Sequence, residues 1–261
     1  MTPNTINSLA QALHKARLEK APLEQISKEI KDFSRNDAYS IQEKGIELRQ
    51  EMGETVVGMK MGLTSEAKRK QMDLDSPLYG VLTQEMEIKS GGQYKLDPQI
   101  HPKIEPEVAF LIKSELKGSP SREEVLAATK GVCACMEILD SRYEQFKYFS
   151  MEDVISDNSS SSQFILGEWV EDFKDIDLRD LSLKMTVNGK IAQEGNTSAI
   201  SDDPVVSVIQ LCELLEKRGK SLPANSIVLA GAATIAVKLE AGMKVDLSMQ
   251  ALGSVSVIVG N

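Results

Sequence analysis

The sequence predicts an α+β protein in which a helical N-terminal section precedes a β-rich core. Apolar residues recur at helical spacing through roughly the first fifty residues, whereas the rest of the chain consists mainly of short strand-like runs separated by loops. The pair Asn188-Gly189 stands between two such runs and is a strong hairpin signal, because both central positions of that turn need positive φ. We expect a single unit of residues 1–261, with a helical section at 1–53 and a β-rich core at 54–261.

Three helices are expected in the N-terminal section. The first is indicated by apolar residues at helical spacing, namely Ile6, Leu9, Leu13 and Ala16. The second runs from about Leu23 to Phe33. Asn36 or Asp37 can cap a third helix that ends at Gly53.

The β-rich part contains several runs that indicate strands: "VVGMKMGL", "KIEPEVAFLIK", "VCACMEILD", "SQFILGEWV", "LSLKMTV", "SIVLAG" and "KVDLSMQALGSVSVIVG". Helices interrupt these strands at about Arg122–Thr129 and at Val205–Lys217. The chain shows no internal repeat and no shift in composition that would mark a linker between domains.

The composition argues against several classes of protein. With 41% hydrophobic and 26% charged residues, the chain resembles an ordinary globular protein. A net charge of -9 argues against broad nucleic-acid binding, and the best basic cluster, Lys68-Arg69-Lys70, is short and is interpreted as a solvated helical face. No run is long enough to span a bilayer and the start lacks a signal-peptide core, so we expect a cytoplasmic protein without membrane association. The three cysteines lack zinc-type spacing and are interpreted as buried, reduced thiols.

Two carboxylates lie two residues apart in the run "HPKIEPEVAF". Because side chains alternate along a strand, Glu105 and Glu107 point the same way, roughly 6–7 Å apart along the backbone, and both can reach one cation. These ten residues alone favour a solvated face. However, Ala109 and Leu111 lie on the same face as the acids, which indicates that this face becomes covered and that the acids lie near the rim of a cavity.

Glu137 is the one carboxylate in the otherwise apolar run Val132–Leu139. An unpaired charge in a buried strand is costly, so Glu137 needs a partner. Arg142, near in sequence, is one candidate. The other is a divalent cation shared with Glu105 and Glu107, because three carboxylates with open positions suit a hard cation such as Mg²⁺ or Mn²⁺. Spacing alone leaves both alternatives open.

Two further stretches are open to a structural or a functional interpretation. Lys60 stands between apolar residues of an expected strand, either as a surface lysine or as a partly desolvated ammonium that neutralises an anion or transfers a proton. The loop "SDNSSSSQF" can hold a carboxylate or make capping bonds with equal ease. No G-x-G-x-x-G, P-loop, G-x-S-x-G or H-E-x-x-H motif occurs, and two histidines supply a catalytic triad or a His-based metal site poorly.

Six motifs, taken in order, resemble the hydratase/decarboxylase branch of the fumarylacetoacetate hydrolase superfamily: "GMKMGLTSEAKRKQM", "SPLYGVLT", "HPKIEPEVAF", "MEILDSRY", "DNSSSSQFILG" and "NGKIAQEG". The resemblance runs from the N-terminal helices to the C-terminal strands. It implies a mixed β-sandwich or roll core that holds one Mg²⁺ or Mn²⁺, and an enzyme of the meta-cleavage catabolism of aromatic compounds.

The resemblance also implies roles for particular residues. The family's E-x-E pair and third acidic ligand fall on the metal ligands Glu105, Glu107 and Glu137. Its active-site lysine falls on Lys60, and its serine-rich substrate loop falls on Asp157–Ser162. The residues expected to contact a small dicarboxylate substrate are Lys60, Leu78, Arg142, Ser160 and Ser161.

Within the branch, the expected reaction is the metal-dependent decarboxylation of 2-oxo-3-hexenedioate. The alternative is vinylpyruvate hydratase activity, which adds water to 2-hydroxypenta-2,4-dienoate. Hydratases typically carry an Asp where this chain has Leu78 and tend towards "DNASSG" where it has "DNSSSS", so both departures favour decarboxylation. A third alternative is a non-catalytic subunit that organises the partner hydratase. The presence of all three acids and of Lys60 argues against a purely structural role. We expect a homo-oligomer and a complex with the hydratase.

Overall fold

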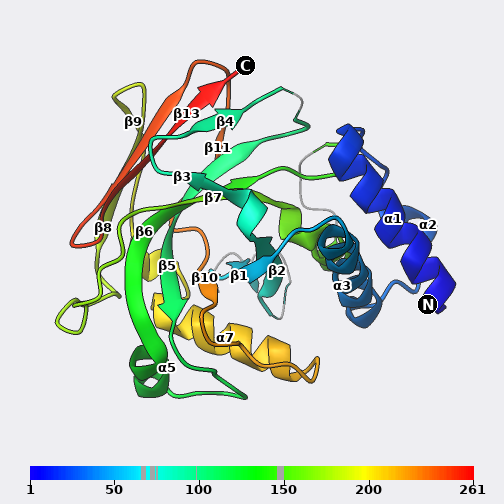
Figure 1. Cartoon of the computed structure of the whole chain (residues 1–261), viewed down its shortest axis with the longest axis horizontal. Helices are drawn as coiled ribbons and strands as arrows, with labels where there is room; N and C mark the ends of the chain where they lie inside the picture. Colours follow the sequence, from blue (N-terminus) through cyan, green and yellow to red (C-terminus); the bar gives the residue numbers. More distant parts are fainter. Residues whose placement is uncertain (66–68, 71–73, 75, 98, 146–149) are drawn as a thin grey trace.

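The computed structural model consists of two sheets with helices packed around them (Figure 1). It describes residues 1–65, 69–70, 74, 76–97, 99–145 and 150–261. None of the helices among these residues combines the length and the apolar character needed to cross a membrane.

The N-terminal section is helical, as predicted. Its helices are α1 (Pro3–Glu19), α2 (Ile26–Glu29) and α3 (Arg35–Glu51). The cap of α3 differs from the expected one, because Ser34 occupies the capping position and its hydroxyl accepts the N–H of Asp37 at 3.2 Å. Asp37 completes a capping box with its own carboxylate, and so lies in the first turn rather than ahead of the helix.

Helix α2 is much shorter than the range expected from the sequence. Long-range contacts hold this segment: the N–H and the hydroxyl of Ser27 both donate to the carboxylate of Asp153, at 3.0 and 2.5 Å. Leu23 also forms a bridge with Tyr143. These contacts tie the segment to Asp153 of a later helix and to the chain at Tyr143, and the periodicity of the segment does not encode such long-range contacts.

Within the described residues, the larger sheet has eight strands: β1 (Val56–Gly62), β2 (Leu78–Thr83), β3 (Glu87–Lys89), β5 (Lys103–Ile112), β6 (Thr129–Leu139), β7 (Ser161–Leu166), β10 (Ile227–Leu229) and β11 (Val237–Lys238). Their order is β2-β1-β10-β5-β6-β7-β3, with β11 paired to β5. The long central strands β5 and β6 run antiparallel and carry the predicted acids.

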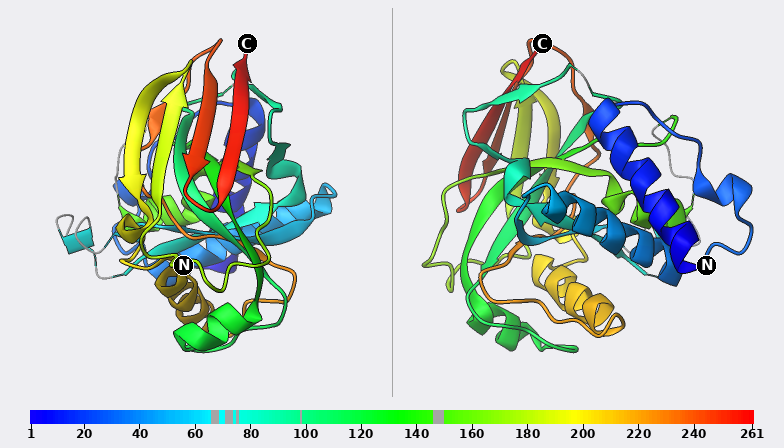
Figure 2. Two further views of the ribbon diagram at one scale, coloured as in Figure 1. Left: turned by 90° about the vertical axis from the view of Figure 1, so that its left-hand side faces the viewer. Right: turned by 45° about the vertical axis from the view of Figure 1, so that its right-hand side comes forward.

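The smaller sheet has five strands in the described part of the chain: β4 (Gln93–Lys95), β8 (Ser182–Val187), β9 (Lys190–Asn196), β12 (Lys244–Met249) and β13 (Gly253–Gly260). Their order is β4-β13-β12-β8-β9. Figure 2 shows β13, β12, β8 and β9 side by side. The predicted hairpin joins β8 to β9, with φ of 50° at Asn188 and 76° at Gly189. The long C-terminal run splits into the antiparallel pair β12 and β13.

The further helices with bounds in the described part of the chain are α5 (Arg122–Ala128), α6 (Met151–Ser156) and α7 (Pro204–Glu216), together with the short turns η1 (Gln84–Met86), η2 (Asn158–Ser160) and η3 (Thr197–Ala199). Helices α5 and α7 confirm the two predicted interruptions and pack against each other (Figure 1). Helices α1 and α3 cover the opposite side of the molecule from the smaller sheet (Figure 1).

The main hydrophobic core draws on both sheets. The even positions of β5, which the sequence predicts as an apolar face, are fully buried in it: Ile104, Val108, Phe110 and Ile112. Strand β6 contacts β12 and β13 of the smaller sheet. The acids Glu105 and Glu107 occupy odd positions of β5 and therefore lie on the opposite face of the strand.

The prediction of a solvated basic face at Lys68-Arg69-Lys70 is wrong for Arg69. That side chain is buried, and its guanidinium donates to the carbonyl oxygens of Leu63 at 2.7 Å and Thr64 at 2.6 Å. Lys68 lies outside the described residues. The cysteines are buried, as predicted, at positions Cys133, Cys135 and Cys212.

Candidate active site

Three carboxylates meet where β5 and β6 pair. The antiparallel register places Glu105 directly opposite Glu137, and Glu107 follows two residues further along β5 on the same face. One oxygen of each carboxylate lies within 4.8 Å of the others. Glu107 and Glu137 are fully buried, whereas Glu105 is partly exposed. The register thus brings together the acids that the sequence singled out.

Glu107 has the environment of a ligand rather than of a stably ionised carboxylate. Burial raises the pKa of Glu107 well above its usual value, and the negative charges of Glu137 and Glu105 raise it further. Its Oε2 atom accepts the N–H of Gly231 at 2.7 Å, while its buried Oε1 atom has no hydrogen-bond partner among the described residues. An unpartnered buried oxygen beside two further acids suits a hard divalent cation such as Mg²⁺. The residues present therefore fit a metal ion.

Lys60 is the partner of Glu137. The Lys60 ammonium lies 3.1 Å from Oε2 of Glu137, and the Ser161 hydroxyl donates to Oε1 at 2.9 Å. Burial raises the pKa of Glu137, and the charge of Lys60 is the largest opposing influence. The sequence left open an ion pair between Glu137 and Arg142. In the structure Glu137 pairs with Lys60 instead, and Arg142 pairs with Asp157.

Lys60 is itself buried, with 2% of its surface exposed, so it is no ordinary surface lysine. Strand β1 holds it between β2 and β10, opposite Gly80 and Leu229. A Cβ atom at Gly80 would lie 3.2 Å from Cε of Lys60 and 2.7 Å from the carbonyl oxygen of Asn158. The glycine therefore lets the lysine stem and the serine-rich loop approach the strand closely.

The serine-rich loop contains successive residues with positive φ, a backbone conformation that residues other than glycine rarely adopt. Asn158, Ser159 and Ser160 have φ of 50°, 56° and 56°, a left-handed conformation that costs roughly 1–2 kcal/mol per residue. The Asn158 side chain holds the turn, because it accepts the N–H of Val81 at 2.7 Å and donates to the same residue's carbonyl at 2.9 Å. Strain of this kind gathers at functional sites.

The loop presents its serines to different places. Ser159 and Ser160 line a cavity that also contains Lys60 and Glu105 in its lining, which we call the main cavity. The hydroxyl of Ser161 is instead directed to Glu137. The sequence predicted contacts from Ser160 and Ser161 and did not single out Ser159. Its only signal was membership of the serine run, since the left-handed turn that aims Ser159 inward is invisible in the residue types.

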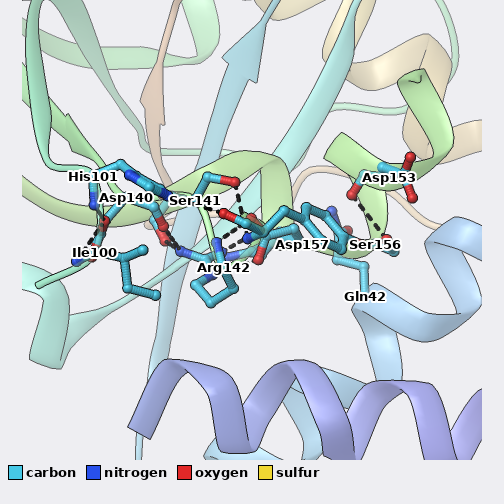
Figure 3. A network of polar contacts seen from close by, with 12 residues as sticks. Gln42, Ile100, His101, Asp140, Ser141, Arg142, Asp153, Ser156 and Asp157 are labelled. Carbon is cyan, nitrogen blue, oxygen red and sulfur yellow. Dashed lines mark hydrogen bonds and ion pairs between the residues drawn. The ribbon is translucent and has the colours of Figure 1, made fainter. Parts of the chain in front are cut away.

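Arg142 is hydrogen-bonded to the serine-rich loop and to the carbonyl of Asp140 (Figure 3). Its Nε atom donates to the carboxylate of Asp157, Nη2 donates to the Asp157 carbonyl, and Nη1 donates to the carbonyls of Asp140 at 2.5 Å and Ser161 at 3.0 Å. The side chain is buried and does not line the main cavity. Arg142 therefore holds the loop in place, which differs from the substrate contact expected from the sequence.

We expect Arg142→Met to destabilise the protein by about 3–5 kcal/mol, because breaking a buried ion pair leaves the partner charge uncompensated. Burial already raises the pKa of Asp157 to about 6, and the Arg142 charge works against this rise. Urea unfolding monitored by fluorescence measures the change. Arg179→Met, at an exposed pair with Asp177, is the control, and equal stability of the two variants would contradict the assigned role.

The N-terminal helices brace the same region (Figure 3). Gln42 of α3 donates to the carbonyl of Tyr79 at 2.9 Å and to that of Ile155 at 3.1 Å. The Ser156 hydroxyl donates to the carbonyl of Asp153 at 2.9 Å. Helix α3 is thereby tied both to β2 and to α6, which leads into the serine-rich loop.

The main cavity, of about 360 Å³, lies beside the acid cluster and is lined by Glu105 and by Lys60, the partner of Glu137. Among the described residues, its charged lining consists of Lys60, Lys103 and Glu105, and its hydroxyl groups include those of Ser159 and Ser160. The apolar part of the lining includes Leu63, Leu78, Val154 and Ala236. The cavity can therefore hold a small anion that contacts a metal at one end.

Comparison with known proteins agrees with this arrangement. Residues 53–259 match the family described as Fumarylacetoacetate (FAA) hydrolase C-terminal. The 4-oxalocrotonate decarboxylase of Pseudomonas sp. (strain CF600) is 37% identical over 98% of this chain and 97% of its own length. The 2-hydroxyhexa-2,4-dienoate hydratase of Comamonas testosteroni is 32% identical over 97% and 96%.

The fold is also that of a solved structure. The 4-oxalocrotonate decarboxylase from Pseudomonas putida G7, complexed with magnesium and adipate, superposes with a TM-score of 0.95 and 34% identity, covering 99% of this chain and 98% of that one. The predicted fold type is confirmed. The family match, the near full-length relatives and the shared fold agree, and the chain belongs to the fumarylacetoacetate hydrolase family.

Proposed function

We propose that this protein catalyses the metal-dependent decarboxylation of 2-oxo-3-hexenedioate, also called 4-oxalocrotonate, to 2-hydroxypenta-2,4-dienoate and CO₂. The observation that carries the proposal is a three-carboxylate cluster, paired with a buried lysine, in a chain that is 36–40% identical to proteins named 4-oxalocrotonate decarboxylase. We propose that residues 1–261 act as one catalytic unit with Mg²⁺, or Mn²⁺ in its place, held by Glu105, Glu107 and Glu137.

The reaction needs an electron sink rather than a base. The bond between C5 and the departing C6 carboxylate breaks, and its electrons pass through the C3–C4 double bond to the 2-keto oxygen, which leaves a dienolate and CO₂. The dienolate then takes up a proton. A divalent cation bound to the acids supplies Lewis acidity towards the keto oxygen, worth several kcal/mol of charge stabilisation.

The chain's own groups position the substrate and balance its charge. Lys60 lies beside Glu137 and lines the cavity, so its ammonium offsets negative charge that develops on the dienolate. Ser159 and Ser160 present polar groups to the C1 end of the substrate. Leu78 is fully buried and keeps its part of the cavity apolar.

Leu78 also favours decarboxylation over hydration. Hydration needs a group that activates water, and the resemblance assigns that position to an Asp in hydratases. Here Leu78 lines the cavity and offers no such group. The hydratase relatives are 29–32% identical, below the decarboxylases.

The proposal is tested by CO₂ release from 2-oxo-3-hexenedioate. We expect release by the purified protein with Mg²⁺, and at least a 100-fold slower rate after treatment with a chelator, because the electron sink is lost. Readdition of Mg²⁺ restores the rate. Conversion of 2-hydroxypenta-2,4-dienoate to a hydrated product without CO₂ release would establish the hydratase instead.

We extend the proposal to the protein's surroundings. A cytoplasmic homo-oligomer that associates with vinylpyruvate hydratase fits the chemistry, because the product of decarboxylation is the substrate of that enzyme. Relatives of both kinds match nearly the whole chain. Co-elution of the purified chain with the hydratase in size-exclusion chromatography supports the complex, and separate elution of the two at micromolar concentration contradicts it.

A further inference from the structure

We propose that Lys103 receives the distal carboxylate of the substrate and makes the site selective for dianions. The inference rests on the proposed function and names a residue that the sequence analysis did not single out. Lys103 lines the main cavity on the same strand as Glu105 and Glu107. It acts in substrate binding and not in the bond-breaking step.

Lys103, Glu105 and Glu107 occupy alternate positions and therefore share one face of the strand. Glu107 is fully buried, whereas Glu105 and Lys103 are partly exposed. Lys103 and Glu105 thus line the cavity side by side, and Glu107 lies buried beyond Glu105 on the same face.

The length of the substrate matches the spacing between Lys103 and Glu105. Two residues along a strand advance roughly 6–7 Å, which separates Lys103 from Glu105. A six-carbon chain has five carbon–carbon bonds of about 1.5 Å, so its two terminal carboxylate carbons lie about 6 Å apart when extended. A substrate whose C1 carboxylate and keto oxygen lie at the acids therefore places its C6 carboxylate near the Lys103 ammonium.

Charge balance makes the same assignment. A divalent cation and Lys60 together carry as much positive charge as Glu105, Glu107 and Glu137 carry negative charge. A dianionic substrate is then stabilised by further positive charge beside its distal carboxylate. In the part of the chain that the structure describes, Lys103 is the cation other than Lys60 in the cavity lining, whereas Arg142 is turned to the serine-rich loop.

The kinetic consequence follows from the direction of electron flow. The C6 carboxylate carries its full charge in the bound substrate and loses it as CO₂ departs. An ion pair with Lys103 is therefore strongest before the transition state, and it does not lower the barrier of the chemical step. Lys103→Met is expected to raise KM at least 10-fold without lowering kcat.

Binding measurements test the proposal without turnover. In the presence of Mg²⁺, we expect the wild-type protein to bind 2-oxoadipate at least 10-fold more tightly than its monoanionic counterpart 2-oxohexanoate in calorimetric titrations. Lys103→Met removes this preference by weakening 2-oxoadipate alone. Lys103→Arg keeps the charge and retains the preference.

The control is Lys238→Met. Lys238 lies directly opposite Lys103 in the β5–β11 pairing, but its side chain is 75% exposed, bonds to Glu240 and does not line the cavity. This variant keeps the wild-type preference. An unchanged preference in Lys103→Met, a wild-type protein without preference, or a fall in kcat at constant KM would each overturn the proposal. Absence of CO₂ release from the wild type would overturn the reaction and leave the calorimetric comparison valid.

Discussion

Glu107→Gln is expected to abolish metal-dependent CO₂ release, with a loss of at least about 10³-fold in kcat, while the chain stays folded. The amide keeps the shape of the side chain and can still accept the N–H of Gly231. It cannot supply the anionic oxygen that now lies unpartnered among the acids. Steady-state kinetics at saturating Mg²⁺ measures the loss.

The folded state of this variant is expected to be at least as stable as the wild type without metal. Burial and the neighbouring acids raise the pKa of Glu107, so the metal-free fold gains little from an ionisable group there. Mg²⁺ should raise the melting temperature of the wild type and of the control Glu194→Gln, an exposed strand glutamate, but not that of Glu107→Gln. Full activity in Glu107→Gln would remove it from the ligand set.

Lys60→Met is expected to lower kcat by about 10²–10⁴-fold, the range associated with loss of a positioned acid or charge in the transition state. The methionine fills a similar volume, so the close approach of Gly80 and the serine-rich loop is retained. Mg²⁺ binding should persist and become tighter, because a positive charge 3.1 Å from Glu137 has been removed.

The matched control is Lys184→Met, an exposed lysine on β8. It should leave both kcat and metal affinity unchanged. A variant at Lys60 that loses metal binding together with activity would show that the lysine shapes the metal site rather than the reaction. The contrast with Lys103→Met is equally informative, since the two lysines are expected to change kcat and KM, respectively.

The local sequence predicts the fold best where pattern and packing agree. The hairpin at Asn188-Gly189, the apolar even face of β5 and the helices α5 and α7 follow from periodicity and turn chemistry. Strands β3, β4 and β11 have two or three residues each and were not expected, because they are defined by partners far away in the chain. Helix α2 was overestimated for the same reason.

The candidate site could be predicted in part. Glu105 and Glu107 share a face because a strand alternates, but their meeting with Glu137 depends on the register between β5 and β6, which no single strand encodes. The partner of Glu137 could not be chosen from proximity in sequence, because Lys60 is 77 residues away and Arg142 is turned to the loop. The family resemblance supplied what the spacing left open.

Glu105, Glu107 and Glu137 are expected to hold the divalent cation together. Anomalous diffraction from crystals grown with Mn²⁺ is the sharpest test of this ligand set. We expect one strong peak, within about 2.5 Å of an oxygen of each of the three carboxylates. A peak elsewhere, or none at a Mn²⁺ concentration that supports CO₂ release, would contradict it.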